Sequence, residues 1–157
     1  MNASAFALAL ISVLACNNSK QTSGPAGPTT AASASSPLMT LDAKGAPETL
    51  YKLESGTTER FMSFPAQRLV LSVNRCRQAD LSLDCDAVKF LRNGPDVAIP
   101  KAKMTGAVSA GALVCAKLGY AMLTARAPNG DEDGVCKFPD GSMASLGALE
   151  QYRLKAE

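Results

Sequence analysis

The positions of the cysteines constrain the fold of this chain more than any other feature of the sequence. The 157 residues hold five of them, and an odd number in a secreted protein leaves one thiol without a partner in the chain. Eight residues separate Cys76 from Cys85, which favours a local bridge between them. Four cysteines allow three pairings, however, and the sequence excludes none of them. The full set is Cys16, Cys76, Cys85, Cys115 and Cys136.

An apolar run over residues 5–15 leads directly into Cys16. The run is too short to span a bilayer, which takes about 20 residues, and has the length of the hydrophobic region of a signal peptide. Its end, Val13-Leu14-Ala15-Cys16, resembles the bacterial lipobox. The resemblance implies that residues 1–15 are a signal peptide that is removed and that the Cys16 thiol carries lipid, which would account for the odd cysteine.

Residues 1–15 contain no lysine or arginine, whereas a signal peptide normally begins with positive charge. Cleavage after Ala15 without lipid, which would leave a free Cys16 thiol, therefore stays open, as does an uncleaved anchor. With lipid on Cys16, we expect membrane anchoring in the bacterial cell envelope. The expected place is the outer membrane, facing the periplasm or the cell surface.

The stretch after Cys16 predicts a flexible linker. Residues 17–37 contain Ser, Thr, Pro, Ala, Gly and other small or polar residues, with no large aliphatic or aromatic side chain to bury. We extend the linker to residue 48, so that residues 16–48 join the lipid to the folded part. A partner-binding linear motif in this stretch is the alternative.

Residues 49–104 predict a segment rich in short strands. Residues 49–53 have the pattern of a strand, and Leu69, Leu71 and Val73 alternate with the period of two that marks a half-buried strand. Residues 97–99 are suited to a short edge strand. Residues 86–92 are compatible with a strand or a helical turn, and the sequence does not decide between them.

From residue 105 to residue 157 the pattern predicts a helix, a β-hairpin and a closing helix. Apolar residues between Ala110 and Leu118 recur at helical spacing, and Gly119 follows where a helix-ending glycine is typical. Two strands follow, at residues 120–125 and 134–138, and Ser142 is suited to begin the last helix. The predicted fold class is therefore α+β, and whether this module shares a core with residues 49–104 is left open.

Two pieces of the module, Cys115-Ala-Lys-Leu-Gly119 and Gly134-Val-Cys-Lys-Phe-Pro-Asp-Gly-Ser142, with the helix after them, resemble a small bacterial domain of unknown function. That domain occurs in short lipoproteins and is often labelled a hemolysin, although nothing in this chain suggests a pore. The resemblance covers residues 107–155. It departs from the family at Tyr120, where a second glycine is usual, and in lacking a tryptophan in the closing helix. We expect a Cys115–Cys136 bridge, worth about 3 kcal/mol.

The turn between the two hairpin strands is the candidate binding loop. Asn129, Asp131 and Asp133 are spaced like the first ligands of a calcium loop, with Gly134 following. No helices of an EF-hand flank them, so we expect a solvated hairpin tip and no metal. Phe138 and Asp140, close by in the sequence, complete the candidate loop.

Composition removes several classes of function. Without histidine the chain cannot form a Ser-His-Asp triad, a Cys-His dyad or a His-ligated zinc or haem site. Without tryptophan and with 5% aromatic residues, a stacking platform for nucleic acid is not expected, and the net charge of +2 without a basic run gives no nucleic-acid partner. Asp84 and Asp86 are expected to be solvated rather than catalytic.

We therefore expect a non-enzymatic binding or structural protein of the envelope, without a cofactor. Its partners would be the membrane, through the lipid, and a protein or cell-wall component. The alternative is an envelope inhibitor of a hydrolase, which would present a rigid, disulfide-held hairpin loop to a cleft.

Overall fold

The computed structural model of the protein describes residues 38–157, and within them both helices and strands are present. The α+β prediction is confirmed at this level. The predicted signal peptide, Cys16 and the linker as far as residue 37 lie outside the described residues. No helix in residues 38–157 has the length and the apolar character that crossing a membrane requires.

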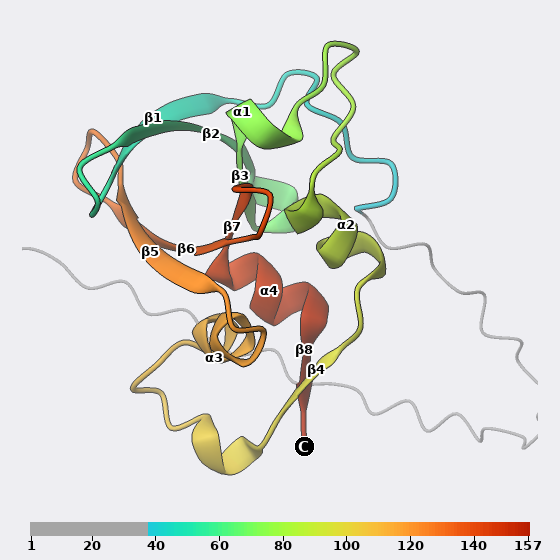
Figure 1. Cartoon of the computed structure of the whole chain (residues 1–157), viewed down its shortest axis with the longest axis vertical. Helices are drawn as coiled ribbons and strands as arrows, with labels where there is room; N and C mark the ends of the chain where they lie inside the picture. Colours follow the sequence, from blue (N-terminus) through green and yellow to red (C-terminus); the bar gives the residue numbers. More distant parts are fainter. Residues whose placement is uncertain (1–37) are drawn as a thin grey trace, which may run out of the picture. The chain divides into compact units, whose positions relative to one another are not determined.

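A closed barrel of six strands dominates the described part of the chain (Figure 1). The strands follow one another around the barrel in the order β1-β2-β3-β7-β6-β5, and each neighbouring pair is antiparallel. A short contact between β1 and β5, with Lys52 opposite Arg126 and Leu53 opposite Ala125, closes the barrel. The strands are β1 (Glu48–Leu53), β2 (Thr58–Phe64), β3 (Leu69–Ser72), β5 (Ala121–Arg126), β6 (Glu132–Lys137) and β7 (Met143–Ser145).

Alternate residues of these strands build two separate cores, because successive side chains of a strand point to opposite faces. In β2, Phe61 belongs to a cluster enclosed by the barrel, whereas Met62 and Phe64 belong to a larger cluster that the helices cover. Tyr51 meets Phe61 edge to face inside the barrel, with ring centroids 5.2 Å apart. The buried residues of the inner cluster are Tyr51, Leu53, Phe61, Ala125, Val135 and Met143.

Helices lie against the outer face of the barrel, and a small parallel sheet lies beyond them, on the side away from the barrel (Figure 1). Leu91 of α2 and Leu149 of α4 are fully buried there, in the same cluster as Leu71 of β3. Residues from both sides of the predicted boundary at 104/105 thus form one barrel and one outer core. The elements are α1 (Val73–Cys76), α2 (Asp86–Asn93), α3 (Ala110–Lys117), α4 (Leu146–Arg153), the 3-10 turns η1 (Pro65–Gln67) and η2 (Lys101–Lys103), and the paired strands β4 (Val97–Ile99) and β8 (Leu154–Ala156).

Local signals explain where helices α3 and α4 begin and end. The Ser109 hydroxyl accepts a hydrogen bond from the Ala112 N–H at 3.2 Å and caps α3, and Gly119 after the helix takes the left-handed φ of 74° that was expected of it. Helix α4 begins after Ser145, which is a correction to the expectation that Ser142 begins it. The two helices cross closely, since a Cβ added at Gly111 would stand 1.8 Å from the Leu146 carbonyl oxygen.

The segment before β1 belongs to the folded unit. Leu38 and Ala43 are buried, at 2% and 7% exposure, although the predicted linker runs to residue 48. The guanidinium of Arg92 donates to the carbonyl oxygens of Leu38, Leu41 and Leu83 at 2.8, 2.8 and 3.1 Å. Residues 38–47 of the predicted linker are therefore part of the folded unit, because apolar side chains such as Leu38 and Ala43 pack into the outer core.

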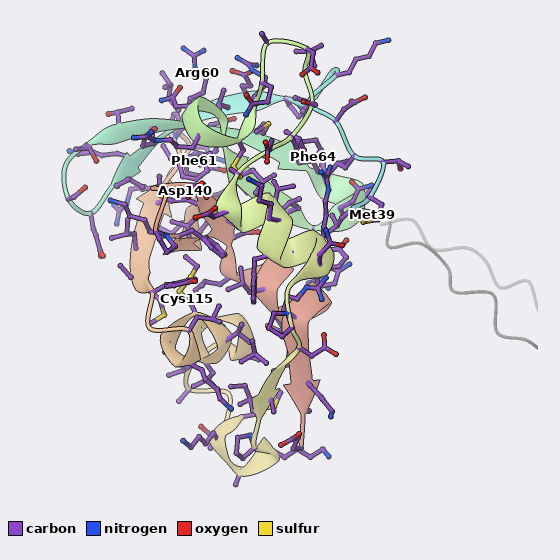
Figure 2. The ribbon with its side chains drawn as sticks, turned by 45° about the vertical axis from the view of Figure 1, so that its right-hand side comes forward. Met39, Arg60, Phe61, Phe64, Cys115 and Asp140 are labelled. Carbon is purple, nitrogen blue, oxygen red and sulfur yellow. A yellow bond between two sulfur atoms is a disulfide. The ribbon has the colours of Figure 1, made fainter. Side chains whose placement is uncertain are left out.

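Both expected disulfides are present. Cys76 pairs with Cys85, with Cα atoms 4.8 Å apart, and Cys115 pairs with Cys136, with Cα atoms 5.9 Å apart. The second bridge joins α3 to β6 and thereby fixes a helix to the barrel wall, as the bond at the labelled Cys115 shows in Figure 2. All four residues are buried, so neither bridge is a surface feature.

Candidate binding surface at the hairpin ends

The tip between β5 and β6 is exposed and internally hydrogen-bonded. The Ala127 N–H donates to the Asp131 carbonyl oxygen at 2.8 Å, which closes the turn, and Gly130 adopts a φ of 92°. The Asn129 amide donates to the Asp131 carboxylate at 2.7 Å, and the Asp131 N–H donates to the Asn129 amide oxygen at 3.2 Å. Asn129 and Asp131 thus hold one another in place at the surface.

The side chain of Asp133 contacts a residue of the barrel and not the tip. The Tyr51 hydroxyl lies 3.4 Å from the Asp133 carboxylate as a hydrogen-bond donor. Burial, and secondarily the negative charge and hydrogen bond of Asp133, raise the pKa of Tyr51 above its ordinary value. Within residues 38–157, no group of three or more histidine, cysteine, aspartate or glutamate residues is placed to hold a metal ion.

The turn between β1 and β2 lies beside this hairpin. The Glu54 N–H donates to the Thr124 carbonyl oxygen at 3.1 Å, which joins the turn to β5. A groove at this seam carries charges of both signs, and Arg126 forms an ion pair with Glu132 across the hairpin. Such a lining suits a polar partner surface better than an apolar small molecule. The groove is lined by Lys52, Leu53, Glu54, Gly56, Thr124, Arg126 and Glu132.

Phe138, another residue of the candidate loop, is part of the outer core. Its side chain is 3% exposed, and its ring centroid lies 5.8 Å from that of Phe90 and 5.1 Å from that of Tyr120. The structure therefore removes Phe138 from the set of residues that a partner could contact. Tyr120, where the resemblance leads one to expect glycine, supplies one of these aromatic contacts.

Asp140 serves the fold by capping a distant helix. Its carboxylate accepts a hydrogen bond from the Asp86 N–H at 2.8 Å, and the Ser142 hydroxyl accepts one from the Ala87 N–H at 3.1 Å. These are two of the amide groups at the start of α2 that have no partner within the helix. Figure 2 shows Asp140 beside the start of this helix.

The pKa of Asp140 reflects the same role. Partial burial opposes ionisation, but hydrogen bonds from Asp86 and Ser142, together with the charge of Arg75, outweigh it and lower the pKa below its ordinary value. The Ser142 hydroxyl donates to Asp140 at 2.6 Å and completes the cap. No local signal in the sequence could have revealed it, because the residues it joins stand 54 positions apart.

The five residues of the candidate loop thus lie at two ends of one strand. Asn129, Asp131 and Asp133 gather at the start of β6, and Phe138 and Asp140 follow its end. A strand of six residues separates the two groups by about 20 Å. The structure therefore reduces the candidate binding surface to the β5–β6 tip and the groove beside it, which we call the hairpin surface.

The carboxylates beside the first disulfide are surface groups. Asp84 forms an ion pair with Lys89 at 3.0 Å, and this contact raises the pKa of Lys89. Asp86, whose N–H bonds to Asp140, starts helix α2. The pair Asp84 and Asp86 has no shared apolar setting of the kind that tunes catalytic carboxylates.

No family model, no curated protein and no solved structure matches the chain. The assignment of a function therefore depends on the hairpin surface, the predicted signal sequence and the resemblance noted over residues 107–155.

Proposed function

We propose that the protein is a lipid-anchored protein of the bacterial cell envelope whose barrel domain binds an envelope protein or a cell-wall component, without catalysis, through the hairpin surface. The apolar run ending at Cys16 supports the lipid anchor, in the outer membrane facing the periplasm or the surface. The observation that carries the binding role is the exposed tip held on a paired framework. Strand β5 is bonded to β1 and β6 to β7, so the tip requires little ordering when it binds.

The module resembling the small lipoprotein domain is part of this proposal. The order α3, β5–β6 hairpin, α4 and the Cys115–Cys136 bridge support it. In this chain, the hairpin of the module together with β7 would contribute three strands of a larger barrel, and residues 48–72 the other three. The proposal does not depend on the hemolysin label.

The second candidate function is inhibition of an envelope hydrolase. The observation in its favour is the same preorganised tip, because a loop that is already ordered loses little conformational freedom on entering a cleft. Asn129 and Asp131 would be the residues that enter the cleft. Cell-wall hydrolase activity, measured with the purified protein added, separates the two candidates, since only an inhibitor lowers it.

The lipid anchor is tested by the intact mass of the protein from bacterial envelopes, before and after reduction and alkylation. We expect a mass that lacks residues 1–15, carries acyl chains and exposes four thiols only after reduction. We expect Cys16→Ser to move the protein to the soluble fraction. An unlipidated wild-type mass with a free thiol would overturn the anchor.

The binding role is tested by in-cell cross-linking followed by recovery of the protein. We expect the double variant Asn129→Ala, Asp131→Ala to lose cross-linked partners that the wild type retains. Asn93→Ala with Asp42→Ala is the matched control, because these residues are also exposed but lie outside the hairpin surface. Equal recovery of partners by both variants would argue against the hairpin surface.

A further inference from the structure

The charges along the chain are unevenly distributed around α3. Between Asp96 and Asp131 there is no acidic residue, whereas the same stretch contains three lysines and an arginine. The overall net charge of +2 conceals this local excess. Because long-range attraction depends on local rather than total charge, the stretch is a candidate for binding an anionic partner.

Three of these lysines and one from β8 come together at the end of the small parallel sheet. Lys101 and Lys103 lie in η2, and the Lys101 N–H donates to a main-chain oxygen of Glu157 at 2.8 Å. Ala98 of β4 accepts a hydrogen bond from the Lys117 ammonium and lies opposite Lys155 in the register with β8. We call Lys101, Lys103, Lys117 and Lys155 the lysine end.

The lysine end is exposed and carries more positive than negative charge. In residues 38–157, Lys155 has a carboxylate partner, Glu157 at 3.7 Å, and no carboxylate lies within 4.0 Å of the other three ammonium groups. The loop that leads from η2 to α3 adds an apolar group, because Val108 is 51% exposed. A cluster of exposed lysines is the pattern of a surface that meets anionic headgroups.

The position of the lysine end agrees with such a contact. In Figure 1 the barrel lies at the top, and η2 with the end of β8 lies at the bottom. A protein resting on its lysine end would therefore leave the barrel away from the contact surface. The 21 residues between Cys16 and Leu38 reach at most about 70 Å when fully extended, so the proposed anchor permits this orientation.

We infer that the lysine end docks on the anionic headgroups of the membrane to which the chain is anchored. This inference rests on the proposed anchor for the identity of the surface, although the charge pattern itself does not depend on it. Each lysine near an anionic surface strengthens binding about fivefold, which corresponds to about 1 kcal/mol. A lipid chain with a basic patch holds a protein on one membrane face more firmly than either does alone.

The test uses the chain from residue 16 onward with Cys16→Ser, so that no lipid contributes to binding. Co-sedimentation is measured with vesicles of phosphatidylcholine alone and of phosphatidylcholine mixed with phosphatidylglycerol. We expect binding to the anionic vesicles alone, weakened as salt is added, because salt screens exposed charges. Lys101→Gln with Lys103→Gln should weaken it about 25-fold, the product of two fivefold steps.

Lys44→Gln with Lys89→Gln is the matched control, because it removes the same charge from exposed positions outside the lysine end. An equal loss of binding in this control would overturn the inference, as would equal binding to both kinds of vesicle or to neither. Binding to a soluble polyanion such as polyglutamate without binding to the anionic vesicles would also overturn it, since the partner would then not be a lipid surface. If the proposal of a lipid anchor is wrong, the mass of the native protein shows this, and the vesicle test of the lysine end is unaffected.

Discussion

The turns at the two ends of strand β6 have similar sequences, but one is exposed and the other is packed against the rest of the fold. Asn-Gly-Asp precedes the strand and Pro-Asp-Gly follows it, and both are polar turns by composition. The first turn is exposed, with Asn129 and Asp131 bonded to each other. The second is held by Phe138 in the outer core and by Asp140 on the start of α2. A turn motif therefore indicates where the chain reverses, whereas its long-range contacts decide whether it is available to a partner.

The largest expected effect comes from removing the aromatic anchor at the structural end of β6. Phe138→Ala should destabilise the protein by about 3–5 kcal/mol, because it empties a buried site between Phe90 and Tyr120. Thermal unfolding measures the loss, with Asn129→Ala as the control from the other end. A melting temperature equal to that of the wild type would show that Phe138 is not the anchor of this turn.

The bridge that ties β6 to α3 should contribute somewhat less. Replacing both Cys115 and Cys136 by serine removes a crosslink with a sequence separation of 21, worth about 3 kcal/mol, and leaves no unpaired thiol. Chemical denaturation checks the value, and the membrane attachment proposed through Cys16 should be unchanged, because that residue is untouched. Unaltered stability would mean that the bridge does not brace the hairpin.

The pH dependence of the stability of Asp140→Asn tests the difference between the two turns. The pKa of Asp140 is lower in the folded state than its ordinary value of 3.8, so ionised Asp140 stabilises the fold at higher pH and loses this contribution as the pH falls through the lowered value. We expect the variant to be about 1 kcal/mol less stable near neutral pH, as for a lost helix cap. The difference should shrink below about pH 4, measured by urea unfolding.

Asp131→Asn at the exposed end is the control for Asp140→Asn. A pH-dependent difference of equal size at this position would contradict the distinction between the two turns. The control shares the chemical change but lacks bonds to a helix start.

The smallest effect on stability is expected at the tip itself. Asn129→Ala with Asp131→Ala should change the free energy of unfolding by less than about 0.5 kcal/mol, because both side chains are exposed and bond chiefly to each other. The same variant carries the binding test described above. A large loss of stability would place the tip among the structural turns and remove the contrast between the two ends.

The sequence was sufficient for the local features. The Cys76–Cys85 and Cys115–Cys136 bridges, helix α3 with its glycine stop and the β5–β6 hairpin were all predicted within a few residues. Each depends on residues near one another in the chain, where spacing carries the signal.

The long-range features could not be predicted from the sequence. Strand β2 has no clean alternation, since Phe61 and Met62 are adjacent and both buried, and it was not predicted. Closure of the barrel depends on Lys52 meeting Arg126, and the cap on α2 depends on Asp140 meeting Asp86. Such pairings join segments far apart in sequence and leave no trace in local propensity. Docking of Leu38 was missed for the same reason.

The Arg92 contacts also have a mechanical consequence. If the chain is anchored at Cys16, a force between membrane and domain reaches the described part of the fold through Leu38. Within residues 38–157, the charged hydrogen bonds from Arg92 to the carbonyls of Leu38 and Leu41 hold the chain close to that point. The Ala43 N–H, bonded to Leu81 at 2.8 Å, stands next in line before β1. These contacts lie outside the barrel, so a pull that detached residues 38–43 would lengthen the tether by several residues while the strands behind it stayed paired.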